Sequence, residues 1–341
     1  MMKCVMKTAA GAGNLQFVQR EIPEYGEDDV LIKVLATAVC GTDVHIQGWN
    51  DWAQRYVTPP IVIGHEFSGE VVKVGGKVKG VKVGDVVSAE THIPCNSCEI
   101  CRIGERHVCP HSGLIGVNRD GCFAEYISLP YQNVVVCDPS VKPEYLCLME
   151  PLGAAVHGVM QYPVSGRKVV VNGCGPIGAM AIAVAKLCGA ARVIAVEPNS
   201  TRAELAKNMG ADVVIDPSKD NAEQVIKGIA KYGADVVLEY SGNAKGIESV
   251  FRFVRPEGKI VFVGLPSERP NVNFSEFIYR GITLKGIAGR RIFNTWEDMN
   301  GMFAAGLDLE PIVTHTLPLE DYEKGLDMML KGECVKTILK P

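Results

Sequence analysis

The sequence has no strongly basic segment, and this absence limits the partners that it can bind. Its 341 residues include 35 Lys and Arg against 39 Asp and Glu, which gives a formal net charge of -4. No long run of Lys and Arg and no basic arm occurs along the chain. Proteins that bind nucleic acid use such segments to neutralise phosphates. We therefore expect no nucleic-acid partner.

Long apolar runs are also missing. No stretch approaches the ~20 apolar residues of a membrane-spanning helix, and the N-terminal MMKCVMKTAAGAGNLQ lacks the apolar core of a leader peptide. Internal repeats, low-complexity segments and long linkers are absent too. With 47% hydrophobic and 22% charged residues, a chain of this length can form two domains with separate cores. We expect a soluble, cytoplasmic protein with no membrane partner.

Cysteine, by contrast, is abundant. Twelve cysteines are many for a reducing compartment unless several bind metal. Cys95, Cys98, Cys101 and Cys109 follow the spacing C-x2-C-x2-C-x7-C, which lets one short loop turn four sulfurs toward one point. A ferredoxin run has a shorter last gap, and a disulfide pair conflicts with a cytosolic location. Four thiolates suit tetrahedral zinc, so we predict a closed structural zinc site in a lobe at about residues 90–112.

Two upstream segments and one downstream segment carry candidate ligands for a second metal. In AVCGTDVHIQGW a strand-like run ends at Cys40, and in PPIVIGHEFSGEVV another runs into His65 and Glu66. A further carboxylate, Glu150, lies in CLMEPLGAAVHG. Singly, such a cysteine is more often core filler, and such a histidine is more often a hydrogen-bonding residue. Together, a thiolate, an imidazole and a carboxylate are a plausible ligand set for catalytic zinc, which keeps one position open for water or substrate.

From Arg167 onward, apolar strands alternate with helices. Strands that read as continuous Val and Ile runs are typical of a parallel sheet covered on both faces. We therefore predict an α/β doubly wound domain. The predicted strands are residues 168–172, 192–196, 213–215, 235–240, 259–264 and 282–286.

The first turn of this domain carries a G-x-G-x-x-G motif between a strand and a helix. Its residues are Gly173, Cys174, Gly175, Pro176, Ile177 and Gly178. The glycines allow a tight turn and a close approach of pyrophosphate to the helix N-terminus, and Pro176 suits the first helical turn. Glu197 ends the second strand, where its carboxylate would bind the ribose hydroxyls and repel a 2'-phosphate. This favours NAD over NADP, and the nearby Arg202 keeps NADP open.

With these motifs in the same order, the whole chain resembles the zinc-dependent medium-chain alcohol dehydrogenases. A narrower likeness, to the branch of that family that oxidises threonine, is carried by CGTDVHIQGWNDWAQ, THIPC, GVNRDGCFAEY, GRRIFNTW and GLDLEPIVTH. The resemblance implies a Rossmann domain inserted in a GroES-like β-barrel catalytic domain. The implied boundaries are 1–155 for the catalytic domain, 156–293 for the NAD-binding domain and 294–341 for a C-terminal return to the catalytic domain. The family resemblance also implies a homotetramer.

The resemblance further implies the roles of the site residues. Cys40, His65 and Glu150 would bind the catalytic zinc, and Glu66 would be an exchangeable ligand or an adjacent carboxylate. Thr42 and His45 would carry the alcohol proton outward while hydride passes from a zinc-bound alkoxide to NAD. The cofactor contacts would be the glycine-turn residues and Glu197, together with Arg202, Val263, Leu265, Ile287 and Ala288.

The implied reaction converts L-threonine to 2-amino-3-oxobutanoate. His92 would contact the substrate or lie at the surface, and Trp49 would wall the cleft or pack the catalytic domain. The sequence after Glu150 and Pro151, and Ala288 where an aromatic residue is frequent, differ from the threonine branch. A polyol or vicinal-diol dehydrogenase therefore stays open as an alternative, and a non-catalytic dinucleotide-binding protein is a remote one.

Overall fold

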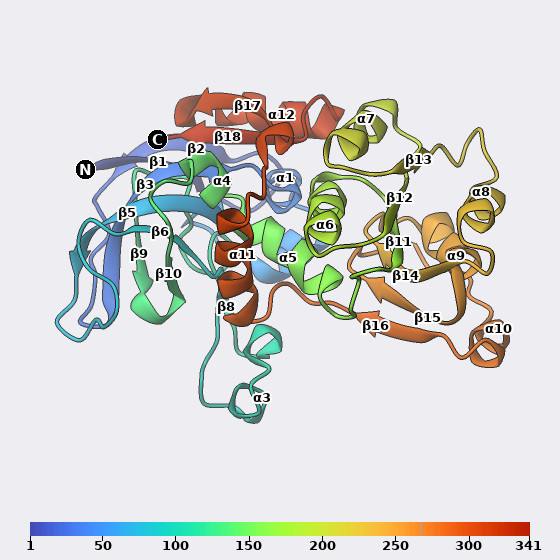
Figure 1. The fold of residues 1–341 in the computed structure, drawn as a ribbon. Coiled ribbons are helices and arrows are strands. Elements are labelled where there is room, and N and C mark those ends of the chain that lie inside the picture. The colour runs from blue at the N-terminus through green and yellow to red at the C-terminus, as the bar shows by residue number, and fades with distance from the viewer. Residues whose placement is uncertain (267) are drawn as a thin grey trace. The chain divides into compact units, whose positions relative to one another are not determined.

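The computed structural model describes residues 1–266 and 268–341, and its contacts divide the chain into two units (Figure 1). The first unit is Met1–Glu150 with Val313–Pro341, and the second is Pro151–Ile312. The predicted boundaries near 155 and 293 differ from this division. The larger difference arises because the 3-10 helix η3 (Glu310–Ile312) contacts helices α6 and α7, so that residues 294–312 group with the second unit.

The first unit is built on a seven-stranded sheet. Its strand order is β10-β6-β5-β3-β18-β17, and β9 also pairs with β3. These strands are β3 (Asp29–Ala38), β5 (Glu66–Val74), β6 (Val86–Ala89), β9 (Tyr126–Pro130), β10 (Val134–Val136), β17 (Val313–Pro318) and β18 (Lys336–Lys340). Strand β18 lies antiparallel to β3, with Ile338 opposite Ala38. The chain therefore ends inside the unit in which it began, as the GroES-like architecture implies.

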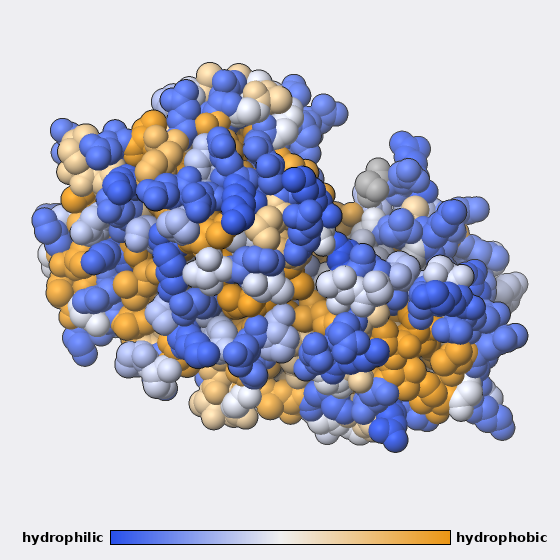
Figure 2. Space-filling model, turned by 90° about the horizontal axis from the view of Figure 1, so that it is seen from above, coloured by the Kyte–Doolittle hydropathy of each residue, from blue (hydrophilic) through white to orange (hydrophobic). Residues whose placement is uncertain are grey.

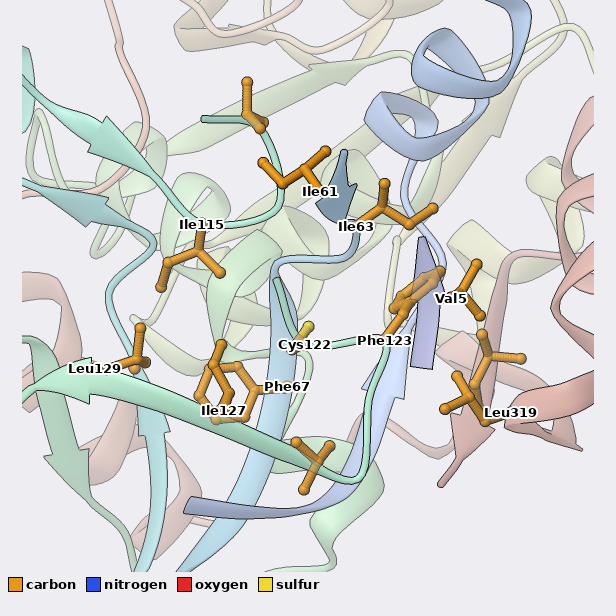
Figure 3. Packing of buried hydrophobic residues seen from close by; sticks show 14 of the residues in the cluster. Val5, Ile61, Ile63, Phe67, Ile115, Cys122, Phe123, Ile127, Leu129 and Leu319 are labelled. Carbon is orange, nitrogen blue, oxygen red and sulfur yellow. The ribbon is translucent and has the colours of Figure 1, made fainter. Parts of the chain in front are cut away.

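A three-stranded sheet and the core complete this unit. Strands β2 (Leu15–Arg20), β1 (Met2–Lys7) and β4 (Ile61–Val62) form the small sheet. Figure 3 shows the packing of the core, in which side chains from separate strands and loops meet around Phe67 and Phe123. Ile63 also belongs to this core, directly before the Gly64-His65-Glu66 segment. The core therefore fixes the backbone that leads into the candidate site.

The second unit contains the predicted doubly wound sheet. Its order is β13-β12-β11-β14-β15-β16, and every neighbouring pair is parallel. The strands are β11 (Lys168–Asn172), β12 (Arg192–Val196), β13 (Val213–Ile215), β14 (Ala234–Glu239), β15 (Val254–Phe262) and β16 (Thr283–Gly286). The helices are α6 (Pro176–Leu187), α7 (Ser200–Asn208), α8 (Ala222–Ile229), α9 (Ala244–Phe253) and α10 (Phe274–Tyr279). The strand order reverses between β11 and β14, and ligands of such sheets bind at the carboxyl ends of the strands near that point.

Apart from the lobe at residues 92–114, a further set of helices completes the fold. They are α1 (Gly41–Gly48), α2 (Asp51–Tyr56), α4 (Pro143–Leu146), α5 (Met149–Val159), α11 (Asn294–Ala304) and α12 (Tyr322–Lys331), with the 3-10 helices η2 (Tyr131–Asn133) and η4 (Leu319–Asp321). Within the described ranges 1–266 and 268–341, no helix combines the length and the apolarity that crossing a bilayer requires.

On the face drawn in Figure 2, hydrophilic residues predominate and hydrophobic residues gather in patches between them.

Candidate active site

Three predicted metal ligands converge in the first unit. The ligand atoms of Cys40, His65 and Glu66 all lie within 4.8 Å of one another. Cys40 follows the end of β3, and Glu66 begins β5, where it lies opposite Ala38 in the register of the two strands. Pairing of β3 with β5 therefore brings the two predicted segments together at one end of the sheet.

Gly64 turns the backbone into this cluster. Its φ of 88° lies in the left-handed region, and a Cβ built on it would be 2.1 Å from Cδ1 of Phe123. Phe123 is fully buried and belongs to the same core as Ile63 (Figure 3). Glycine alone fits both the conformation and the space at this position. The core therefore fixes the direction from which His65 enters the site.

Asp43 lies between Cys40 and His65 and is hydrogen-bonded to the first of them. Its Oδ2 accepts a 2.9 Å hydrogen bond from the Cys40 N–H, and its Oδ1 lies 3.9 Å from Nδ1 of His65. Asp43 Oδ1 and His65 Nδ1 are both buried without a hydrogen-bond partner among the described residues. Burial raises the pKa of the Asp43 carboxyl. Because Nδ1 faces Asp43, Nε2 is the nitrogen that His65 can offer to a metal, and this donor set fits zinc.

Lys336 forms a buried ion pair with Glu66. Its Nζ lies 2.5 Å from Oε1 and 2.6 Å from Oε2 of the carboxylate, and it also donates a 3.0 Å hydrogen bond to the carbonyl of Val39. Burial acts to lower the pKa of Lys336, but the negative groups around it, Glu66 first and then Cys40 and Glu150, together hold that pKa above its usual value. The sequence analysis did not identify Lys336. The sequence shows only a single charged residue before the strand-like TIL, and this does not indicate that the side chain is buried.

Glu150 lies near this cluster but outside the group of three. It is the second residue of α5, and its Oε1 accepts a 3.3 Å hydrogen bond from Oγ1 of Thr91. Burial raises the pKa of the Cys40 thiol, and the negative charges of Asp43 and Glu150 act in the same direction. A cation bound between the thiol and these carboxylates would oppose all three effects. The prediction that Glu150 is a zinc ligand remains a prediction.

The two predicted proton-carrying residues lie on helix α1. Thr42 is half-buried, and its Oγ1 lies 3.7 Å from Sγ of Cys40. His45 is exposed and follows three residues later, a spacing that places both side chains on one face of the helix. The arrangement runs from Cys40 toward solvent.

The predicted substrate residues lie in different surroundings. His92 is half-buried, and Oε1 of the buried Glu90 accepts a 2.9 Å hydrogen bond from its backbone N–H and lies 2.9 Å from its Nδ1. Trp49 caps the end of α1 with a left-handed φ of 52°, and Nζ of the buried Lys7 lies 4.7 Å from its ring centroid. The Trp49 ring also packs against the core of the first unit.

The four predicted zinc cysteines form one cluster in a separate lobe. The lobe contains β7 (His92–Ile93), α3 (Glu99–Arg102), η1 (Arg106–Val108) and β8 (Gly113–Leu114). The sulfur of Cys109 lies 3.6 Å from that of Cys95 and 3.8 Å from that of Cys98. Tetrahedral zinc with bonds of about 2.3 Å to sulfur requires separations of about 3.8 Å. Hydrogen bonds from the Ser97 N–H, the Ser97 hydroxyl and the Cys98 N–H lower the pKa of Cys95 to about 5, which favours the thiolate that zinc binds.

In the second unit, each glycine of the turn has its own geometric reason. Gly173 has a φ of 86°, and a Cβ on it would lie 2.6 Å from Cα of Ser241. A Cβ on Gly178 would lie 2.0 Å from the carbonyl oxygen of Gly173, so the helix packs closely on the strand end. A Cβ on Gly175 would meet nothing within 4 Å, which leaves open space at the N-terminus of α6 beside Pro176. This open cradle fits a dinucleotide pyrophosphate.

Glu197 lies against the same turn. Its Oε2 accepts a 2.7 Å hydrogen bond from the Cys174 N–H, and its Oε1 accepts a 2.9 Å hydrogen bond from the Asn199 N–H. Arg202 is exposed on α7. The other predicted cofactor contacts are Ile177, Val263 and Ile287, which are half-buried, and Leu265 and Ala288, which are exposed.

Family models match both halves of the chain. Residues 26–139 match the alcohol dehydrogenase GroES-like domain, and residues 176–305 match the zinc-binding dehydrogenase model. A relative named L-threonine 3-dehydrogenase, from Caldanaerobacter subterraneus subsp. tengcongensis, is 46% identical over 100% of this chain and 99% of its own.

Solved structures of dehydrogenases share the fold. A zinc-binding dehydrogenase from Sinorhizobium meliloti 1021 bound to NADP has a TM-score of 0.93 at 28% identity, over 100% of this chain and 99% of that one. The 2R,3R-butanediol dehydrogenase from Bacillus subtilis has a TM-score of 0.92 at 27% identity, over 100% of both chains. The predicted fold class is therefore confirmed.

Proposed function

This chain belongs to the zinc-binding dehydrogenase family, and we propose that it oxidises the 3-hydroxyl of L-threonine to give 2-amino-3-oxobutanoate, with NAD as the hydride acceptor. The observation that carries the proposal is the convergence of Cys40, His65 and Glu66 beside Thr42. The 46% identity to a relative named L-threonine 3-dehydrogenase, over the whole chain, supports the choice of substrate.

Each chain would hold one catalytic and one structural zinc ion. Cys40, His65 and Glu150 would hold the first, with Glu66 exchanging between its ion pair with Lys336 and the metal. The four cysteines of the lobe would hold the second, which has no open position and serves only to fold the lobe. Zinc held by these residues would act as a Lewis acid and would lower the pKa of a substrate hydroxyl, so that its proton could leave near neutral pH.

The residues of the chain then move the proton and orient the substrate. Thr42 Oγ1 would accept the proton of the substrate hydroxyl while it releases its own hydroxyl proton toward the exposed His45, which would pass a proton to solvent. We propose that His92, with its Nδ1 beside Glu90, contacts the amino or carboxylate group of the substrate. In this scheme Trp49 contributes an apolar wall.

The cofactor is NAD in this proposal. Glu197 is supported as the ribose-binding residue by its contact with the glycine turn, because its negative charge there would repel a 2'-phosphate. Val263, Leu265, Ile287 and Ala288 would contact the rest of the dinucleotide. Arg202, which is exposed nearby, is the residue by which NADP could be accepted instead.

A substrate panel tests the proposal. Purified, zinc-loaded protein is assayed for NADH formation with L-threonine, other hydroxy amino acids, 2,3-butanediol and sugar alcohols. L-Threonine should give the highest kcat/KM. The second candidate is a vicinal-diol or polyol dehydrogenase, favoured by the similarity to the Bacillus subtilis butanediol dehydrogenase. Turnover of a diol without turnover of L-threonine would replace the first candidate by the second.

The Cys40→Ser variant separates an enzyme from a dinucleotide-binding protein without catalysis. Serine is a poor zinc ligand, so we expect turnover to disappear while NAD binding persists. Wild-type turnover in this variant would remove Cys40 from the mechanism.

Assembly and location are proposed as well. The family resemblance supports a homotetramer, and exposed apolar residues of α10 in the second unit are suited to contact a second copy. They are Phe274, Ile278 and Tyr279, which are 63%, 68% and 90% exposed. Sedimentation velocity tests this assembly. All twelve cysteines are free in the structure, which supports a cytoplasmic location.

A further inference from the structure

Glu239, a fully buried acid at the end of β14, has no part in the chemistry described above. Its Oε1 accepts hydrogen bonds from the Ser241 N–H at 2.7 Å, the Ser241 hydroxyl at 2.5 Å and the Gly242 N–H at 3.1 Å. Its Oε2 accepts a hydrogen bond from Nδ2 of Asn172. Among the described residues it has no ion pair with Lys, Arg or His. The carboxylate is therefore held by neutral donors alone.

Such a group is costly to bury. Burial raises the pKa of Glu239 above its usual value, although all four hydrogen bonds oppose this. A buried carboxylate persists only where its hydrogen-bond network is satisfied, and a satisfied network rigidifies what it joins.

The network joins two turns at the carboxyl edge of the sheet. Asn172 is the last residue of β11 and directly precedes Gly173, the first glycine of the dinucleotide turn. Ser241 and Gly242 form the turn that follows β14. Glu239 therefore ties the end of β11 to the turn after β14 at the point where the strand order reverses.

Glycines surround this network so closely that it has little freedom to move. A Cβ on Gly173 would lie 2.6 Å from Cα of Ser241. A Cβ on Gly246, in α9, would lie 2.5 Å from Oγ of Ser241 and 3.1 Å from Nδ2 of Asn172. A shift of the Ser241 side chain would therefore press on both the dinucleotide turn and α9.

A third turn rests on the same network. A Cβ on Gly264 would lie 2.4 Å from the backbone nitrogen of Gly242. Gly264 lies between Val263 and Leu265, two of the proposed cofactor contacts. Glu239 holds residues 172 and 241–242 in place. The positions of the glycine turn, of the turn at residues 241–242 and of residues 263–265 thus depend on Glu239.

We propose that Glu239 is a positioning residue for the dinucleotide: it fixes the glycine turn, the turn at residues 241–242 and the turn at residues 263–265 relative to one another, and so sets the affinity for NAD without touching it. This inference rests on the proposed dinucleotide site, and it does not depend on which alcohol is oxidised.

The test compares Glu239→Gln with Asp235→Asn. Asp235 lies at the opposite end of β14, where its Oδ2 accepts a 2.9 Å hydrogen bond from the N–H of Lys168 at the start of β11. Asp235 therefore joins β11 and β14 at the edge of the sheet that lies far from the dinucleotide turns. Both variants remove a charged acceptor between β11 and β14, but only Glu239→Gln should loosen the dinucleotide site.

We expect Glu239→Gln to raise the Kd of NAD, measured by calorimetric titration, by about tenfold or more, because it weakens hydrogen bonds to a charged group. KM for NAD should rise likewise, while kcat at saturating NAD and KM for the alcohol change little. Asp235→Asn also weakens the 2.8 Å ion pair of Asp235 with Arg255. It should nevertheless leave the Kd of NAD within about twofold, because the change lies at the end of β14 far from the dinucleotide turns. A properly folded Glu239→Gln protein with wild-type affinity for NAD would overturn the inference.

A polarity swap provides the rescue. In Glu239→Gln the new amide faces the amide of Asn172, donor against donor. Adding Asn172→Asp restores a donor and an acceptor, while the oxygen of the new amide still accepts from the N–H groups of Ser241 and Gly242. The double variant should recover most of the lost affinity for NAD. Asn172→Asp alone should lose more affinity than Glu239→Gln alone or the double variant. Failure of the swap to restore affinity would count against the positioning role.

Two other results need separate interpretation: a Glu239→Gln protein that does not fold, and a wild-type protein that binds no NAD. If Glu239→Gln does not fold, Ser241→Ala carries the test. It removes one donor to Glu239, and with it the acceptor of the Asn243 N–H, but it leaves the hydrogen bonds from the Ser241 and Gly242 N–H groups to Glu239 intact. A wild-type Kd in that variant would overturn the inference. If the wild-type protein itself binds no NAD, the proposed dinucleotide site fails rather than the role of Glu239.

Discussion

Replacing Lys336 by Ala should destabilise the first unit by far more than breaking an ion pair of similar length at the surface. The side chains of Lys336 and Glu66 are only 4% and 0% exposed, and Nζ lies 2.5 Å from the carboxylate. Removing one partner leaves a buried charge without compensation, which costs about 3–5 kcal/mol. In a unit of this size, about 2–4 °C of thermal midpoint corresponds to each kcal/mol, so the midpoint should fall by roughly 6–20 °C.

The pair of Lys77 and Glu27 supplies the control. Its atoms lie 2.6 Å apart, but the side chains are 65% and 70% exposed. Lys77→Ala should therefore cost less than about 1 kcal/mol. Both variants are measured by thermal unfolding of zinc-stripped protein, so that no bound cation compensates Glu66. The double variant Lys336→Met with Glu66→Gln should recover at least half of the loss. A Lys336→Ala midpoint no lower than that of Lys77→Ala would refute the view that the pair is buried and ionised.

Three further predictions concern the turns and the metal lobe. Gly64→Ala should cost about 2–5 kcal/mol in unfolding free energy, because the new methyl group meets Phe123 and the backbone φ is left-handed. Gly80 has a φ of 75° but nothing within 4 Å of a Cβ, so Gly80→Ala should cost only about 1–2 kcal/mol. Equal costs would contradict the packing argument. Cys98→Ser should lower the zinc content by one ion per chain and lower the thermal midpoint, which elemental analysis and calorimetry check; an unchanged zinc content would exclude the four-cysteine site. Glu197→Ala should reduce the preference for NAD over NADP, expressed as a ratio of kcat/KM values, by about tenfold or more through loss of charged hydrogen bonds; an unchanged ratio would exclude this role.

The nucleotide-binding half was predictable because its signals are local. The G-x-G-x-x-G turn joins one strand directly to one helix, and Glu197 follows the next strand at the expected distance. Continuous Val and Ile runs marked the strands of the parallel sheet in their correct order along the chain. Each of these features depends on neighbours within a few residues, so one sequence contains enough information.

The roles of Lys336 and Glu239 could not be read in the same way. Lys336 lies 270 residues from Glu66, and its burial depends on the placement of β18 between β3 and β17. Nothing in VKTILK separates it from an exposed lysine of an edge strand. Glu239 ends a predicted strand, but the donors that turn it inward come from β11 and from the turn after β14. Such residues are defined by long-range pairing, which periodicity does not report.

The same reason applies to the end of the second unit. Residues 294–312 follow the last Rossmann strand, and the sequence predicts that the chain leaves the unit there. The contacts of η3 with α6 and α7 are tertiary and have no counterpart in the local pattern. The return to the first unit therefore begins at β17.

The most direct test of the account is a zinc titration of chelator-stripped protein, with bound zinc and NADH formation from L-threonine measured in the same samples. Activity should appear only as the second zinc ion per chain is bound, and Cys40→Ser protein should bind one ion and form no NADH. Full activity with zinc in the four-cysteine lobe alone would contradict the claim that Cys40 and His65 hold the metal that makes the hydroxyl reactive.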